Sequence, residues 1–65
     1  MTSKIILNEN ARVWEMTCNG GETCSACGLA AKAGEVRIFE SGFDQDFVYC
    51  LSCAERNYLV MVEEV

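Results

Sequence analysis

The sequence predicts a small α+β domain that is held together by a bound metal ion. Three observations predict this class: the chain has only 65 residues, it contains five cysteines, and short alternating segments precede a final segment with helical spacing. A chain of this size rarely gains more than about 3–5 kcal/mol of stability from a hydrophobic core alone. We therefore expect residues 1–65 to form a single domain in which the cysteines provide a cross-link or a metal site.

Two short strands are expected in the N-terminal part of the domain, residues 1–18. Residues 4–7 are rich in Ile and Leu, and residues 8–10 follow as a turn. Residues 12–18 then alternate between two sides, a pattern that predicts a strand with one buried face. The positions on the side expected to be buried are Trp14, Met16 and Cys18.

A β-hairpin and a C-terminal helix are expected in the second half of the chain. Residues 34–40 are predicted to form a strand with Val36 and Ile38 facing one way. A polar connection over residues 41–46 joins it to an extended apolar segment over residues 47–49. From residue 51 onward, apolar residues recur at intervals of three and four, which is the spacing of one helical face. The competing interpretation is a strand over residues 58–62, because this segment is rich in Val. The apolar stripe of the expected helix is Leu51, Ala54, Tyr58, Met61 and Val65.

Four of the five cysteines form two Cys-x2-Cys pairs with metal-ligand spacing. The pairs are Cys24/Cys27 and Cys50/Cys53, and 22 residues separate them. Two intervening residues let both thiolates of a pair bind one ion at about 2.3 Å in tetrahedral geometry. The separation between the pairs slightly exceeds the usual spacing of roughly 15–20 residues, which a hairpin loop explains. We therefore predict one Zn²⁺ ion held by these four thiolates.

Other uses of the four cysteines agree less well with the sequence. A redox dithiol would be expected in a thioredoxin-like βαβ pattern, which this chain lacks. A rubredoxin-like iron site suits the small size and acidity, but only the first pair is followed by glycine, whereas both rubredoxin turns contain it. Disulfides are not expected, since the chain lacks both a secretory apolar stretch of about 7–15 residues and a membrane-spanning stretch of about 20. A cytoplasmic location without membrane association follows as the expectation.

The two cysteine pairs are expected to lie on different kinds of backbone. Gly28 follows Cys27 and can adopt the left-handed conformation of a zinc knuckle. Residues 54–56, directly after Cys53, are helix formers, so the second pair is predicted in the first helical turn, where the dipole favours thiolate charge. A knuckle, a hairpin and a helix that provides the last two ligands resemble the treble-clef zinc fingers, over residues 24–65. A zinc ribbon is the alternative fold.

Cys18, the fifth cysteine, is predicted to be a small buried core residue. It shares one side of its expected strand with two large apolar residues, and a free cysteine packs as a small hydrophobic side chain. The alternative is that it replaces one of the ligands. A second metal site has no further cysteine to complete it.

Catalysis has little support in the sequence, and the protein is not expected to be an enzyme. Zinc held by four cysteines has no open position for water or substrate. The chain contains no histidine, so no ordinary nucleophile–base pair is visible. Asp44 and Asp46 flank the expected hairpin tip and are interpreted as solvated loop residues rather than as a cation site.

The charge of the chain disfavours direct nucleic-acid binding. The formal charge is −5, and the five basic residues are scattered along the sequence. Four thiolates and one zinc ion add −2, which brings the domain to about −7. Phosphate contact would have to overcome this field.

A protein partner is the remaining expectation, and the predicted function is that of a non-enzymatic adaptor or regulator. An acidic surface steers association toward a basic partner, such as a protein that itself binds nucleic acid. Leu59, Val60 and Val62 lie off the stripe of the expected helix and would be free for a partner or a second copy, unless the N-terminal strands cover them. The alternatives are a nucleic-acid-binding zinc finger in transcription and a rubredoxin-like iron electron carrier.

Overall fold

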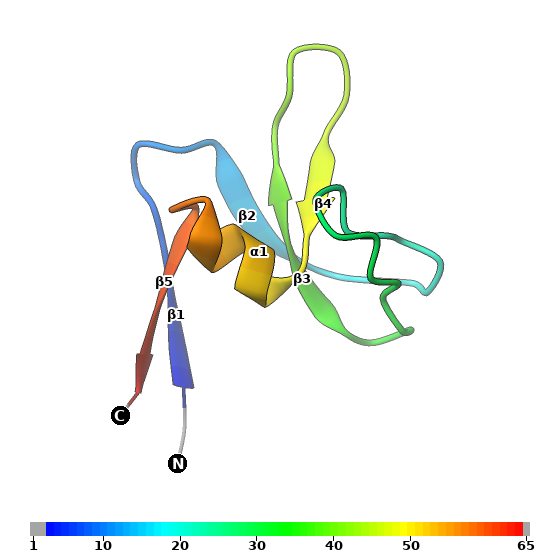
Figure 1. The fold of residues 1–65 in the computed structure, drawn as a ribbon, viewed down its shortest axis with the longest axis horizontal. Coiled ribbons are helices and arrows are strands. Elements are labelled where there is room, and N and C mark those ends of the chain that lie inside the picture. Colours follow the sequence, from blue (N-terminus) through cyan, green and yellow to red (C-terminus); the bar gives the residue numbers. More distant parts are fainter. Residues whose placement is uncertain (1–2, 65) are drawn as a thin grey trace.

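The structure, a computed structural model, describes residues 3–64 as five strands and one short helix. Strands β2, β3 and β4 form an antiparallel sheet, whereas β1 and β5 form a separate antiparallel ribbon. Helix α1 lies between the sheet and the ribbon (Figure 1). No helix in this described range is long and apolar enough to cross a membrane. The elements are β1 (Ser3–Leu7), β2 (Val13–Thr17), β3 (Val36–Glu40), β4 (Phe47–Tyr49), α1 (Leu51–Arg56) and β5 (Val60–Glu64).

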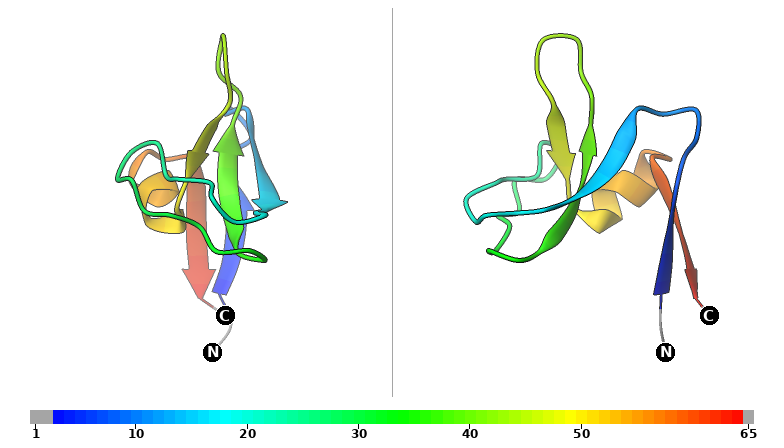
Figure 2. Two further views of the ribbon diagram at one scale, coloured as in Figure 1. Left: turned by 90° about the vertical axis from the view of Figure 1, so that its right-hand side faces the viewer. Right: turned by 180° about the vertical axis from the view of Figure 1, so that it is seen from behind.

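The expected hairpin is present as β3 and β4. Ile38 pairs with Tyr49 and Phe39 pairs with Val48, which fixes the register of the hairpin. The connecting loop projects well beyond the rest of the molecule (Figure 2). Strand β2 extends this sheet on the other side of β3, where the ring of Trp14 stacks on that of Phe39 with centroids 6.0 Å apart. The strands predicted over residues 12–18 and 34–40 are therefore confirmed, each with slightly shorter bounds.

The main hydrophobic core lies where α1 meets the sheet and the ribbon. Ile38 of β3 and Ala54 of α1 are fully buried, and Leu59 and Val60 pack with them. Full burial of an aliphatic side chain of the size of Leu or Ile contributes about 1.5–3 kcal/mol. The core therefore joins both sheets through the helix. Partly buried residues around it are Ile5, Leu7, Ala11, Val13, Tyr49 and Leu51.

The C-terminal helix is shorter than the spacing predicted, and the segment that follows it is a strand. Helix α1 ends at Arg56, and β5 pairs antiparallel with β1 along its whole length. The prediction that Tyr58 and Met61 belong to the helix is therefore wrong. The competing strand interpretation over residues 58–62 is confirmed for residues 60–62, because Tyr58 and Leu59 lie in the turn that precedes β5. The β-branched residues of β5 lie opposite the Ile-rich strand β1, and such cross-strand pairs stabilise a sheet. The predicted stripe also included Val65, which lies outside the described residues.

One further expectation about the N-terminal strands needs correction, and one alternative that the sequence left open is now decided. Only β2 extends the hairpin sheet, because β1 forms the ribbon with β5. This pairing buries Leu59 and Val60 and half-buries Val62, so these residues are not left free for a partner. The N-terminal strand covers them instead.

The buried side predicted for the segment over residues 12–18 is only partly correct. Cys18 is buried and Trp14 is half-buried, but Met16 is 44% exposed. The reason is that α1 packs against the face of the sheet on which Ile38 lies. Met16 is opposite Arg37, in the neighbouring row of the sheet, and so points to the other face.

The turn after α1 is closed by two backbone hydrogen bonds, and Tyr58 occupies its left-handed position. The amide of Leu59 donates to the carbonyl of Ala54 at 2.9 Å, and the amide of Tyr58 donates to that of Glu55 at 3.1 Å. This is the Schellman pattern, in which glycine usually takes the left-handed place. Tyr58 has φ +60°, a conformation that costs a non-glycine residue about 1–2 kcal/mol. Its side chain is 82% exposed, so core packing does not offset this cost.

Replacing Tyr58 by glycine is expected to stabilise the fold. Tyr58→Gly removes the left-handed penalty of about 1–2 kcal/mol and adds an entropic cost of about 0.5–1 kcal/mol in the unfolded chain. We expect the free energy of unfolding in urea to rise by about 0.5–1 kcal/mol on this balance. Tyr58→Ala is the matched control, because it also removes the ring but keeps the Cβ atom. An equal gain in Tyr58→Ala would contradict the explanation.

Candidate metal centre

The first cysteine pair lies in a tight turn that brings its two side chains together. The amide of Gly28 donates to the carbonyl of Cys24 at 2.9 Å, and the amide of Cys27 donates to the Sγ atom of Cys24 at 3.5 Å. Gly28 has φ +80°, a conformation in which a side chain would be strained. The turn expected from the glycine after the first pair is therefore present.

The second cysteine pair lies at the start of α1. Cys50 is the N-cap residue, with an extended backbone, and Cys53 lies within the helix. The backbone and side-chain amides of Asn57 both donate to the carbonyl of Cys53, at 3.0 and 2.7 Å. Because Cys50 directly follows β4, the hairpin and the helix together fix the position of this pair.

Ser25 joins the two halves of the site. Its amide donates to the carbonyl of Val48 at 2.7 Å, and its Oγ atom accepts from the amide of Val48 at 3.3 Å. The turn that contains the first pair is therefore docked on β4, close to the point where Cys50 begins the second pair. These two bonds connect segments that are far apart in the sequence.

The four sulfur atoms of Cys24, Cys27, Cys50 and Cys53, the four-cysteine centre, lie within 4.8 Å of one another. Three of these residues are buried and Cys27 is exposed. The Sγ atoms of Cys27 and Cys50 are 3.7 Å apart. A tetrahedral zinc ion with zinc–sulfur distances of about 2.3 Å requires sulfur–sulfur distances of about 3.8 Å. The donor set and its spacing therefore fit one zinc ion.

The protein backbone favours the thiolate of Cys24. Burial opposes its ionisation, but amide groups of Cys50, Cys27 and Ala26 lower the pKa of Cys24 to about 6. The pKa of Cys53 is raised to about 12, first by its hydrogen bond with Cys50 and then by burial. One negative charge in the centre is thus stabilised by the backbone, whereas a full set of thiolates requires the charge of a bound cation.

Cys18 lies apart from the four-cysteine centre. It is 2% exposed, and its backbone forms hydrogen bonds with those of Gly34 and Glu35, just before β3. Burial raises the pKa of its thiol. The interpretation of Cys18 as a small buried core residue is confirmed.

The exposed hairpin loop does not add a second cluster of ligands. Asp44 and Asp46 are both exposed. Within the part of the chain that the structure describes, the four-cysteine centre is the one group of side chains with metal-ligand spacing. The interpretation of the two aspartates as loop residues agrees with this placement.

A buried arginine on β3, Arg37, braces the loop after the first cysteine pair. Its guanidinium donates to the carbonyls of Leu29 at 3.1 Å and Ala30 at 3.0 Å, and it forms an ion pair with Glu35. The Arg37 side chain is only 1% exposed, whereas the Glu35 side chain is 40% exposed, so the arginine side of the ion pair is the buried one. Sequence reasoning missed this residue. A single arginine between apolar neighbours in a strand is equally typical of an exposed strand face.

Glu35→Gln is expected to flatten the acid side of the pH–stability profile. The hydrogen bond from Arg37 and the amide of Lys32 lower the pKa of Glu35. A carboxylate with a depressed folded-state pKa stabilises the fold fully above the unfolded value of about 4.3, and this contribution is lost as the pH falls toward the folded value. The measurement is the free energy of unfolding of both proteins between about pH 3 and 6. Because both keep the four-cysteine centre, their difference isolates Glu35, and a difference that is constant over this range would contradict the assignment.

The fold and the site together define a small α+β domain with a cluster of four cysteines that could hold a metal ion. No family model, curated protein or solved structure matches this chain. Its function must therefore be inferred from the centre and from the surface around it.

Proposed function

We propose that this protein is a small zinc-binding protein of the treble-clef type that acts, without catalysis, as an adaptor or regulator by binding another protein. The observation that carries the proposal is the complete set of four sulfur ligands. Four thiolates fill a tetrahedral coordination sphere and leave no position for water or substrate. Zinc in such a centre stabilises the fold, and the residues on the surface of the domain carry the function.

The charge of the chain supports a basic partner. The formal charge is −5, and a zinc ion with four thiolates brings it to about −7. One of the five basic residues, Arg37, is buried, which lowers the positive charge available at the surface. This balance favours association with a basic protein over contact with phosphate groups.

Exposed apolar side chains also support a protein partner. Phe43 is fully exposed, Tyr58 is 82% exposed and Met61 is 62% exposed. Aromatic residues and methionine are enriched at protein–protein interfaces. The sequence analysis expected Leu59, Val60 and Val62 to contact a partner, but these residues pack inside the fold. Phe43, Tyr58 and Met61 are among the apolar side chains that remain available to a partner.

The test is affinity capture from a cell lysate with the zinc-loaded protein as bait, with and without nuclease treatment. Protein partners are expected to remain bound after nuclease digestion and to be released at high ionic strength, because salt screens the attraction between exposed charges. Loss of every protein partner on nuclease treatment would contradict the proposal and would favour a nucleic-acid-binding zinc finger.

A further inference from the structure

Tyr58 is an aromatic residue in a place where the fold does not require one. It adopts a left-handed backbone conformation, and most of its ring faces solvent. Backbone strain at an exposed aromatic residue is a feature of binding sites, where the position of the side chain serves a ligand rather than the core. The surroundings of Tyr58 therefore indicate what such a ligand would contact.

A groove of about 480 Å³ lies beside Tyr58, between the end of α1 and the ribbon of β1 and β5. Ile6 and Met61 are direct partners across the ribbon, so they lie on the same face, where they are 37% and 62% exposed. The groove is thus largely apolar, with one acidic residue at the helix. The residues that line the groove include Ile6, Met61, Val60, Tyr58 and Glu55.

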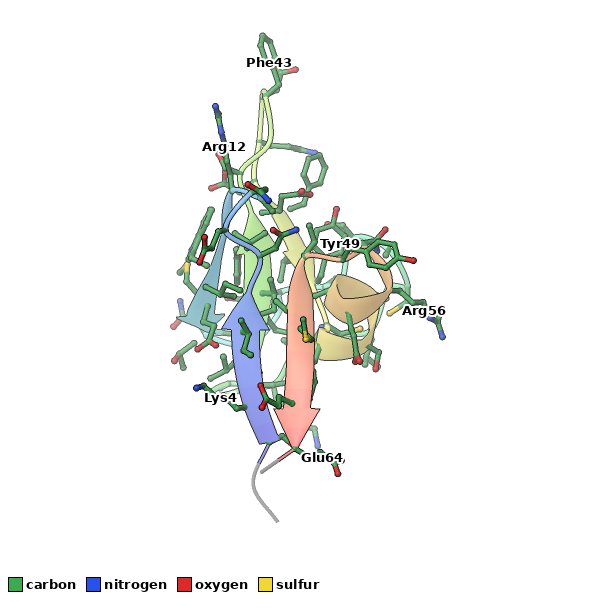
Figure 3. The ribbon with its side chains drawn as sticks, turned by 90° about the vertical axis from the view of Figure 1, so that its left-hand side faces the viewer. Lys4, Arg12, Phe43, Tyr49, Arg56 and Glu64 are labelled. Atoms are coloured by element: carbon green, nitrogen blue, oxygen red, sulfur yellow. The ribbon has the colours of Figure 1, made fainter. Side chains whose placement is uncertain are left out.

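Charge distinguishes between the possible occupants of the groove. Glu55 is the one charged residue among the described residues that line it. A second copy of the chain would bring the same net charge of −5, and a nucleic acid would bring phosphate. Arg56 projects outward from α1 (Figure 3) and lines a neighbouring hollow, not this groove. The groove itself therefore favours a cationic group.

An arginine or lysine side chain matches each part of this site. Its aliphatic stem can lie along apolar residues, its charged end can pair with a carboxylate, and an exposed tyrosine ring attracts a cation over its face. We propose that the groove binds a basic segment of a partner protein, with an arginine or lysine between Tyr58 and Glu55. A neighbouring apolar side chain of that segment packs on Ile6 and Met61, which lie side by side on the face of the ribbon. This assignment rests on the proposed adaptor function and identifies the groove as the surface that binds the partner.

The experiment uses a library of short random peptides, displayed on phage and selected on the zinc-loaded protein. The selected peptides are then measured by calorimetry against Tyr58→Gly, which is expected to keep the fold, and against Glu55→Lys. Matched controls are Phe43→Ser and Asp44→Lys, which make similar changes at the hairpin tip, where Phe43 points away from the body (Figure 3). The folded state of each variant is checked by its zinc content and circular dichroism.

We expect the selected peptides to contain arginine or lysine next to an apolar residue. Their affinity is expected to fall roughly tenfold or more in each groove variant and to stay unchanged in both hairpin variants. Peptides that lack a basic residue, or that depend on the hairpin variants instead, would overturn the groove assignment while leaving a protein-binding function in place. The absence of any selected peptide, or self-association of the wild-type chain through this face, would also overturn it. The nuclease experiment tests the adaptor function independently.

Discussion

Cys24→Ser and Cys50→Ser are each expected to unfold the chain. Structural zinc contributes apparent free energies of about 10–16 kcal/mol in small finger peptides, whereas the core of so short a chain contributes only about 3–5 kcal/mol. Both cysteines are buried, and Cys50 also begins α1, so loss of the metal would release the turn and the helix together. Far-UV circular dichroism and zinc content measured on the purified variants check this expectation.

Cys18→Ala is the matched control for these two variants. Cys18 is as buried as Cys24 and Cys50 but lies outside the four-cysteine centre. Removing its sulfur leaves a small cavity, which costs far less than the loss of a metal ion. We expect Cys18→Ala to stay folded with one zinc per chain. Zinc lost in Cys18→Ala but kept in Cys24→Ser would show that the ligands are wrongly assigned.

Arg37→Met is expected to cause the second largest loss of stability. Arg37 makes two hydrogen bonds to the carbonyls of Leu29 and Ala30, and bonds to a charged group contribute roughly 1.5–3 kcal/mol each. Methionine keeps much of the side-chain volume but cannot donate to either carbonyl. The expected loss is about 3 kcal/mol, the lower end of the sum, because water can reach part of the opened loop. Urea denaturation of the zinc-loaded proteins measures this loss.

Two further variants separate the bonding of Arg37 from its charge. Arg37→Lys keeps the positive charge but lacks the planar group that reaches two carbonyls at once, so it is expected to recover only part of the stability. Arg12→Met removes an arginine that is exposed, and it is expected to change stability by less than about 0.5 kcal/mol. A loss in Arg12→Met equal to that in Arg37→Met would mean that net charge, and not the bracing of the loop, determines stability.

The cluster of cysteines could be predicted from the sequence because its determinants are local. The spacing within each pair, the glycine after Cys27 and the helix formers after Cys53 each specify a turn of a few residues. The hairpin between the pairs was equally predictable, since its two strands are close in the sequence. Local rules specified each half of the centre, whereas the bonds of Ser25 with Val48 that join the halves connect distant segments.

The pairing of β1 with β5 and the hydrogen bonds of Arg37 to the loop could not be predicted, because both depend on contacts between separate segments of the chain. Met61 continues the spacing of the helix, whereas the Val content of the same segment indicates a strand. Only the pairing of β5 with β1, from the opposite end of the chain, decides between the two. Arg37 likewise acquires its role from the carbonyls of the loop that lies over it. Neither the pairing of β5 with β1 nor the contacts of Arg37 can be predicted from a local sequence pattern.

The identity and the role of the bound metal are tested most directly on the wild-type protein purified without added metal. Elemental analysis is combined with circular dichroism before and after treatment with a chelator. We predict one zinc ion per chain, loss of the folded spectrum when zinc is removed, and its return when zinc is added. A red, iron-loaded protein, or a chain that stays folded without any metal, would contradict this account.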